Sequence, residues 1–213
     1  QDAEEVWRLT LEALAAAVAE SGAREAAAIG LSVQGDAIIP VGPDFIPVHP
    51  ALLGMDYRPT EEADWCGRTI GARALFELTG MRPHPINSIV KALWLKRRRP
   101  EAYRTAWKIV TYGDFILGRL GAEAVIDWTM ASRTMAFDLD RRTWAAELLG
   151  VMGIEPALLS RPAPSGVEAG KLRAEVAARV GLAPGALLVT GGHDQTCAAL
   201  GAGMNRPGIG VLS

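Results

Sequence analysis

Cysteine and histidine are scarce in this sequence, with two of the first and three of the second among 213 residues. Cys66 and Cys197 lie far apart and take part in no CxxC or Cys/His pattern. A disulfide framework and a structural zinc site are therefore not expected, and the cysteine usage is typical of a protein from the reducing cytoplasm. We predict no metal site built from the side chains of this chain.

Excess charge of one sign and long apolar runs are also missing. The formal net charge is -2, which gives no electrostatic attraction for nucleic acid or for an anionic membrane surface. No apolar run approaches the roughly 18–20 residues of a membrane-spanning helix. What is present is 49% hydrophobic and 22% charged residues, a composition typical of a globular protein with a real core. Neither nucleic acid nor a membrane is therefore expected as a partner.

Helical patterns alternate along the chain with single apolar strands, which predicts an α/β layered fold with a mixed sheet flanked by helices. Turn and cap signals predict helices over 2–21, 60–80, 88–99, 114–120, 140–153, 169–182 and 194–204. Strands are expected over 26–33, 107–113, 186–192 and 208–212, with a strand pair formed by 37–41 and 45–50 and a short linker at 160–166. The chain opens inside a helix pattern and stops inside a strand pattern, so we expect it to be part of a longer chain.

The segment TGGHDQ, residues 190–195, combines a strand end, two glycines and a carboxylate. In α/β sheets ligands bind beyond the carboxyl ends of strands, and glycines there let backbone and ligand approach closely. Asp194 is expected at or near a helix N-terminus, where the helix dipole favours an ionised carboxylate that can accept a proton from a substrate hydroxyl. An ordinary helix N-cap is the competing interpretation. His193 and Cys197 have no further ligating neighbour in the sequence, which argues against a metal or nucleophile cluster.

Two further segments carry polar groups after apolar runs. Gln34, Gly35 and Asp36 follow the strand that ends GLSV, and an amide and a carboxylate at a strand end suit hydroxyl recognition; an ordinary turn would need the same residues. Asp56 and Arg58 stand two residues apart, a spacing that puts both side chains on one side of a strand. They could pair with each other or bind a polyol.

Five segments taken together, in this order, resemble the FGGY carbohydrate kinase family. They are IGLSVQGDA, LLGMDYRPTEEA, TGMRPHPINSIVKALWLKRRRPE, VTYGDFILGRLGAEAVIDWTMASRTMAFDL and VTGGHDQTCAALGAGM. The second is similar to the family's Trp-x-Asp-x-Arg segment, with Gly54 in place of the usual Trp. Each motif alone is weak, but five in the family's order cover nearly the whole chain.

The resemblance implies an incomplete actin-like (ribonuclease H-like) ATPase fold. It places the N-terminal domain at residues 1–204, without its first phosphate-loop hairpin, and the start of the C-terminal ATP-binding domain at 205–213. A family Asp-x-Gly-Thr loop would precede Gln1, and a Gly-Thr loop would follow Ser213. ATP and Mg²⁺ are therefore expected mainly on parts of the protein outside this chain, and the chain alone is expected to be inactive.

Carried over position by position, the resemblance implies that Asp194 is the catalytic base. It also implies that Gln34, Gly35, Asp36 and Asp56 contact a sugar, sugar acid or polyol, although relatives carry Arg or Met at the position of Gly35. The implied reaction transfers the γ-phosphoryl group of ATP to a substrate hydroxyl, with a xylulose-like sugar as the most general substrate; a homodimer is compatible with it. The alternative is a non-catalytic actin-like module that binds sugar as a sensor. Loss of either flanking phosphate loop would favour that alternative.

Overall fold

Two chain segments far apart in the sequence run side by side through the centre of the protein. The computed structural model describes residues 1–210. In it β1 (Ala28–Ile29) pairs in parallel with β10 (Leu187–Val189), and β2 (Ser32–Val33) pairs in parallel with β11 (Gly192–His193). β9 (Glu168–Lys171) lies antiparallel along the other edge of β10. The strands predicted over 26–33 and 186–192 are thus confirmed, each broken into two short pieces.

Three more strand pairs surround this centre. β3 (Ile39–Val41) is antiparallel to β4 (Lys108–Val110), β5 (Val125–Asp127) is parallel to β8 (Arg161–Ala163), and β6 (Phe137–Asp138) is antiparallel to β7 (Thr143–Trp144). The expected pairing of 37–41 with 45–50 is wrong, because a single bridge between Val41 and Pro47 is all that joins them. Proline lacks the N–H that a longer ladder would need, and residues 43–45 form a 3₁₀ turn. The expected linker at 160–166 contains β8 instead.

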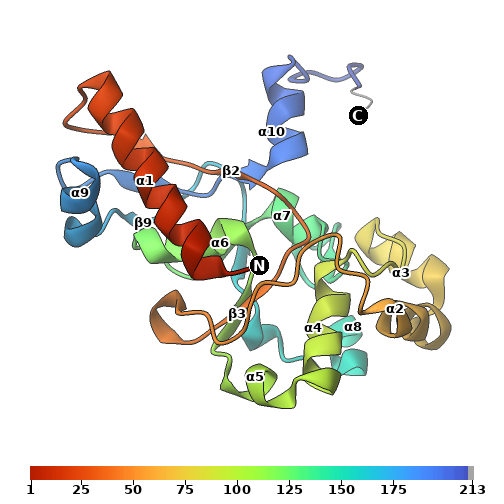
Figure 1. Ribbon diagram of the computed structural model, residues 1–213. Helices are drawn as coiled ribbons and strands as arrows, with labels where there is room; N and C mark the ends of the chain where they lie inside the picture. The colour runs from red at the N-terminus through yellow and green to blue at the C-terminus, as the bar shows by residue number, and fades with distance from the viewer. Residues whose placement is uncertain (211–213) are drawn as a thin grey trace.

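The first core lies under α1 (Ala3–Ser21), α6 (Tyr112–Leu120) and α9 (Ala174–Val180). Asp2 caps α1 by accepting from the backbone N–H groups of Glu4 and Glu5, and the helix ends at a left-handed Gly22, as its pattern predicts. Figure 1 shows α1 beside α9, with α6 behind them. Trp7 and Leu11 are the large side chains that α1 buries in this core.

The second core lies among α2 (Thr60–Cys66), α3 (Ala72–Thr79), α4 (Ser88–Arg98), α5 (Pro100–Thr105) and α8 (Ala146–Met152). The helix predicted over 60–80 is interrupted by a π turn at Gly67–Gly71, and Gly71 has a φ of 99° that breaks the helix. The helix predicted over 140–153 covers only α8, because Thr143 and Trp144 pair with β6. The helix predicted over 169–182 begins at Ala174, since residues 168–171 form β9.

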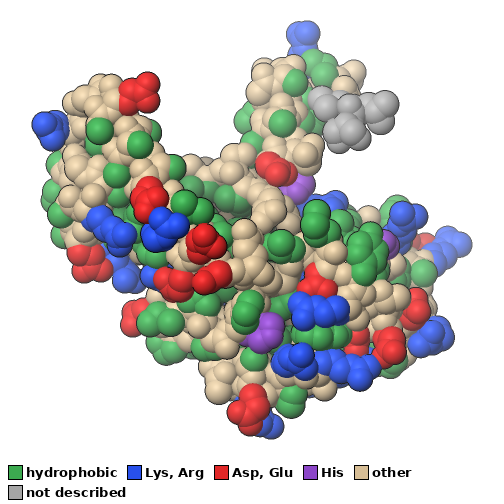
Figure 2. Space-filling view, in the orientation of Figure 1, with side chains coloured by type: hydrophobic (Ala, Val, Ile, Leu, Met, Phe, Trp, Pro, Cys, Tyr) green, Lys and Arg blue, Asp and Glu red, His purple; other side chains and the backbone are tan. Residues whose placement is uncertain are grey.

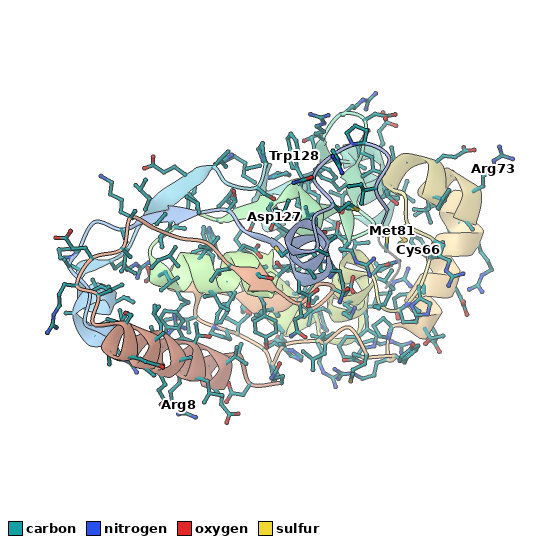
Figure 3. All side chains as sticks on the ribbon, turned by 90° about the horizontal axis from the view of Figure 1, so that it is seen from above. Arg8, Cys66, Arg73, Met81, Asp127 and Trp128 are labelled. Carbon is teal, nitrogen blue, oxygen red and sulfur yellow. The ribbon has the colours of Figure 1, made fainter. Side chains whose placement is uncertain are left out.

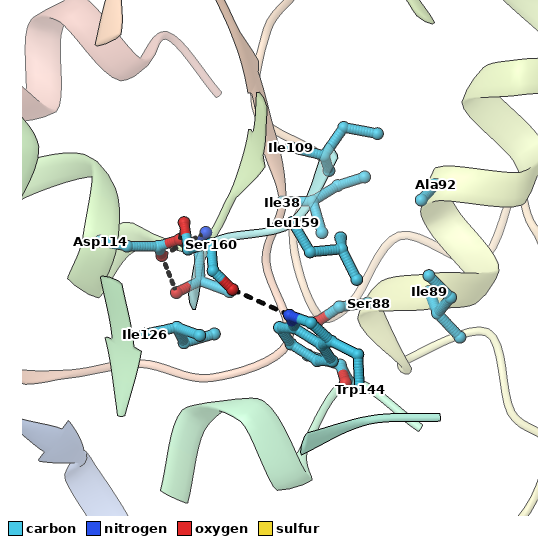
Figure 4. A pocket seen from close by; sticks show the side chains of 12 residues that line it. Ile38, Ser88, Ile89, Ala92, Ile109, Asp114, Ile126, Trp144, Leu159 and Ser160 are labelled. Carbon is cyan, nitrogen blue, oxygen red and sulfur yellow. Dashed lines mark hydrogen bonds between the residues drawn. The ribbon is translucent and has the colours of Figure 1, made fainter. Parts of the chain in front are cut away.

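A buried carboxylate ties the two cores together. Asp114 on α6 accepts from the Thr111 N–H at 2.6 Å and from the Thr111 hydroxyl, and also from the Ser160 hydroxyl. The Ser160 carbonyl in turn accepts from the Trp144 indole N–H at 2.9 Å, which Figure 4 shows beside a small apolar pocket. Burial raises the pKa of Asp114 to about 6, although its hydrogen bonds oppose this shift.

Two short helices follow strand ends and stand near each other. α7 (Trp128–Ser132) begins after β5, and Figure 3 labels Asp127 and Trp128 at its start. α10 (Asp194–Gly201) begins after β11 and projects from the body of the protein (Figure 1). Residues 208–210 have no regular structure, and the remainder of the strand expected over 208–212 lies outside the described residues. Within residues 1–210, no helix is both long enough and apolar enough to cross a membrane.

Candidate active site

The parallel pairing of β2 with β11 brings two of the sequence motifs to one edge. Ser32 lies opposite Gly192, and Val33 lies opposite His193. The next residues along each strand are Gln34 and Asp194, so both motifs leave the pair at its carboxyl end. This is the edge at which ligands bind in α/β sheets.

Asp194 is the first residue of α10, close to where the sequence places it. It is not the N-cap, because that position belongs to His193, whose side chain makes no capping bond. The Asp194 Oδ1 accepts from the Gln195 N–H at 2.7 Å, and the His193 Nε2 lies 3.3 Å from the same oxygen. The side chain remains 44% exposed. An accessible carboxylate at the positive end of a helix is suited to act as a base.

The two glycines before His193 serve the packing of the chain rather than the approach of a ligand. A Cβ on Gly191 would lie 1.8 Å from the Leu31 carbonyl oxygen, and a Cβ on Gly192 would lie 2.9 Å from the Cys197 Sγ. The Gly192 N–H donates to the Leu31 carbonyl at 2.9 Å. The expectation that the glycines clear space for a ligand is corrected in this respect: they let β10 and β11 approach the strand that carries Gln34.

Asp36 is held in a strained conformation by the N-terminal part of α4. Its φ is 67°, in the left-handed region that non-glycine residues seldom adopt. The Lys91 Nζ and the Ser88 hydroxyl each donate to the Asp36 carbonyl at 3.1 Å. Lys91 is fully buried, and desolvation lowers its pKa to about 8, against the opposing effect of nearby carboxylates. Two donors from one helix therefore fix the direction in which the Asp36 side chain points.

The Asp36 carboxylate has one engaged and one free oxygen. Its Oδ2 accepts from the Arg133 Nη2 at 3.1 Å, an ion pair in which Asp36 is 10% exposed and Arg133 is 33% exposed. Its Oδ1 and the Arg133 Nε are both buried and have no hydrogen-bond partner among residues 1–210. Buried polar atoms are nearly always paired in proteins, so an acceptor and a donor left open together indicate a polar ligand.

These groups line one open cleft of about 450 Å³. Gln34, Gly35, Asp36 and Asp194 all contribute to it, so the structure brings together four of the five residues predicted from the sequence. The rest of the wall of this strand-end cleft comes from Leu53, Gly54, Met55, Tyr57, Ile86, Arg133, His193 and Gln195. Figure 2 shows α10 standing clear of the body of the protein above a hollowed surface.

Asp56 is the predicted site residue that does not line the cleft. It lies in a loop rather than a strand, and its carboxylate is engaged by Arg58, whose Nε donates to Oδ1 at 2.9 Å and to Oδ2 at 3.0 Å. Hydrogen bonds from Arg58 hold the pKa of Asp56 below its usual value. The Arg58 guanidinium lies 4.6 Å from the centroid of the Trp94 ring. Of the two roles left open by the sequence, the structure has the mutual pair.

Sequence reasoning missed Arg133 and gave no role to His193. Arg133 follows α7, whose Asp127 cap accepts from the N–H groups of Thr129 and Met130 at 2.9 and 3.0 Å. The Thr129 hydroxyl accepts from the His193 N–H at 2.8 Å, which joins α7 to the end of β11. The Asp-x-Thr pattern was the available signal for this junction, but nothing local in the sequence connects it to residue 193.

The described residues provide no metal centre. Among residues 1–210 no group of three or more His, Cys, Asp or Glu side chains is arranged to hold an ion. These residues do not fit an Mg²⁺ site of their own, so we assign no step at this cleft to a metal held by this chain.

Comparison with known proteins connects this geometry to a family. Residues 1–201 match the FGGY family of carbohydrate kinases, N-terminal domain. A xylulose kinase of Streptomyces coelicolor is 33% identical over 208 residues, which are 95% of this chain and 42% of that protein. An L-fuculokinase of Escherichia coli is 31% identical over 75% of this chain and 34% of its own length. The crystal structure of a xylulose kinase from Rhodospirillum rubrum superposes with a TM-score of 0.87 at 25% identity, over 98% of this chain and 43% of that one.

The chain thus spans less than half the length of the relatives it matches. Its fold is that of the actin-like sugar kinases, as the resemblance implied, and the order of its motifs agrees with the extent of the match. On the strength of the match over residues 1–201, the chain belongs to the FGGY family of carbohydrate kinases and represents its N-terminal domain.

Proposed function

We propose that this chain supplies the sugar-binding cleft and the catalytic base of an ATP-dependent carbohydrate kinase. The observation that carries the proposal is the strand-end cleft itself, in which the accessible Asp194 carboxylate shares one wall system with the unpartnered Asp36 Oδ1. A base and an open hydroxyl acceptor in one cleft suit a substrate with several hydroxyl groups.

In this proposal the substrate binds with one hydroxyl donating to the Asp36 Oδ1 and another group accepting from the Arg133 Nε. Both atoms are buried, so a bound hydroxyl would satisfy groups that otherwise lack partners. Gln34, at the end of β2, contributes an amide that can both donate and accept. Substrate recognition therefore uses directional bonds to hydroxyl groups rather than net charge.

Asp194 then accepts the proton of the hydroxyl that attacks the γ-phosphoryl group of ATP. Phosphoryl transfer depends mainly on positioning and on neutralising charge, so the chief tasks of this chain are to orient the hydroxyl and to take its proton. ATP and Mg²⁺ would bind on the remainder of the protein, and we propose that residues 205–213 begin the domain that holds them. Closure of that domain over the cleft would exclude water.

For the substrate we propose a five-carbon ketose such as xylulose. Two of the relatives described above are named xylulose kinases, and one is named an L-fuculokinase. Gly54 stands where the family usually has Trp, and Gly35 adds no side chain to the cleft, so the site has room for a substrate longer than three carbons.

The test is a screen of the full-length protein for ADP release in the presence of pentuloses, hexuloses, aldonates and polyols. The proposal expects saturable ADP release with at least one ketose, well above the rate without sugar. If a sugar binds but no compound raises ADP release, the chain is a sugar-binding module and not part of a kinase. If an aldonate or a polyol is preferred by a wide margin, the kinase assignment stands and the ketose assignment fails.

A further inference from the structure

His193 is the residue of the strand-end cleft to which the proposed reaction gives no task. Its side chain is only 12% exposed, so it forms part of the cleft wall and not a solvated surface. Its backbone is fixed twice, by the pairing with Val33 and by the N–H donated to the Thr129 hydroxyl at 2.8 Å. The start of the side chain is therefore well placed with respect to both Gln34 and Asp194.

The imidazole ring occupies the space that a side chain at position 35 would need. A Cβ built on Gly35 would lie 2.6 Å from the His193 Cδ2 and 2.7 Å from its Nε2, closer than real Cβ contacts allow. The φ of Gly35 is not in the left-handed region, so its backbone does not require glycine. The absence of a side chain at position 35 is thus explained by the ring that covers it, and the two positions form one packing unit.

The same ring faces the proposed base. The His193 Nε2 lies 3.3 Å from the Asp194 Oδ1, the oxygen that also accepts from the Gln195 N–H at 2.7 Å. A carboxylate oxygen can only accept, so the ring nitrogen facing it carries the proton in either the neutral or the cationic form. No hydrogen bond from residues 1–210 reaches the Asp194 Oδ2, which leaves that oxygen to receive a proton from the substrate.

We propose that His193, seated over Gly35, is a positioning residue that holds the Asp194 carboxylate with Oδ2 directed at the substrate hydroxyl. The side chain of Asp194 is 44% exposed and stands on the first residue of a helix, where several rotamers are open to it. Contacts of this kind are often long in the unliganded state and tighten when substrate binds. A base held in one rotamer raises kcat, because the reacting atoms meet in the productive geometry more often.

This inference rests on the proposed kinase function, and its first test is a set of substitutions at position 193 in the full-length protein. His193→Phe keeps the ring volume and removes the donor; we expect kcat to fall at least roughly tenfold, the usual scale for such groups, with KM changed less than about twofold. His193→Gln places an amide N–H near the position of Nε2, and we expect it to retain kcat within a few-fold of the unmodified protein. Equal kcat values for the unmodified protein and His193→Phe would overturn the inference.

The second test uses the packing unit and does not depend on His193→Phe folding well. Gly35→Ala is expected to lower kcat because its Cβ displaces the ring. In a His193→Ala background, which has no ring to displace, the same substitution is expected to cost much less, so the two effects are non-additive by more than about 0.5 kcal/mol, equivalent to a factor of two or more in kcat. Additive effects would overturn the coupling.

Asp194→Asn separates the two proposals. If this variant loses turnover while His193→Phe and Gly35→Ala leave kcat unchanged, the kinase function stands and the role of His193 is rejected. If Asp194→Asn itself retains turnover within a few-fold, the failure lies in the assignment of the base and therefore in the proposed function. Thermal unfolding of each variant confirms that the kinetic differences are measured on folded protein.

Discussion

At the scale of single residues, the Asp36 carboxylate combines features that rarely occur together without a ligand. It is buried, its backbone is strained, one oxygen pairs with Arg133, and the other has no partner among residues 1–210. Strain of this kind persists only where the surroundings enforce it, and here Lys91 and Ser88 hold the carbonyl. The strain is consistent with a side chain that must point into the cleft.

Asp36→Asn tests this role. The amide keeps the shape but weakens the pairing with Arg133 and replaces one acceptor by a donor, so a bound hydroxyl loses its partner. We expect KM for the sugar to rise by about ten- to a hundredfold, which corresponds to the loss of one hydrogen bond to a charged group. Steady-state kinetics of the full-length protein measure this, with Asp140→Asn, an exposed aspartate that does not line the cleft, as the matched control. An unchanged KM would remove Asp36 from the binding site.

At the scale of elements, the site depends on how closely the strand leading to Asp194 approaches the strand leading to Gln34. Gly191 is the position at which this approach is tightest, since any side chain would overlap the Leu31 carbonyl. The short pieces β2 and β11 are two residues each, so one displaced contact would shift the whole pair.

We therefore expect Gly191→Ala to destabilise the protein by at least about 2 kcal/mol, because backbone atoms rather than flexible side chains must move. Gly150→Ala is the matched control: Gly150 lies on α8 with nothing within 4 Å of the added Cβ. In a helix this change should stabilise by about 0.5–1 kcal/mol. Urea unfolding of the full-length variants compares the two, and a Gly191→Ala variant as stable as the unmodified protein would show that the approach of the strands is not tight.

The elements also show what sequence patterns could and could not predict. Residues with strong local signals were placed well: the Asp2 cap and Gly22 bound α1, and the apolar runs before Gln34 and Gly192 form central strands. The pattern failed where tertiary pairing decides the structure. Thr143, Trp144 and the 168–171 segment carry helix-compatible residues but pair as strands with partners that no local window contains.

The same limit applies to the candidate site. Gln34, Asp36 and Asp194 could be predicted because each follows an apolar strand in its own segment. Arg133 could not, because its partner Asp36 is 97 residues away. The link between Gly35 and His193 likewise depends on the parallel pairing of β2 with β11. Asp56 shows the reverse error, in which a local pattern suggested a ligand-binding residue and Arg58 engages it instead.

At the scale of the whole molecule, the buried Asp114 makes stability depend on pH. Its pKa is raised from 3.8 to about 6, so between these values the folded protein holds a proton that the unfolded chain releases. The stabilisation that this group contributes is therefore fully present below about pH 4 and is lost as the pH rises through about 6.

Asp114→Asn removes this titration while keeping an oxygen that can accept from Thr111. We expect the unfolding free energy of the unmodified protein, relative to the variant, to fall by up to about 3 kcal/mol between pH 4 and 7, from the relation between pKa shift and free energy. Urea unfolding at several pH values measures the difference, in which the titration of all other groups cancels. Parallel curves for the two proteins would show that Asp114 does not titrate in this range.

The central claim for the whole molecule is that the strand-end cleft binds a sugar and that Asp194 takes the proton of the hydroxyl to be phosphorylated. The most direct measurement compares Asp194→Asn with the unmodified full-length protein for both sugar-dependent ADP release and sugar affinity by calorimetry. The account predicts a loss of kcat of about a hundredfold or more, the usual scale for a general base, with the Kd for sugar changed only a few-fold. Turnover within a few-fold of the unmodified protein would contradict it.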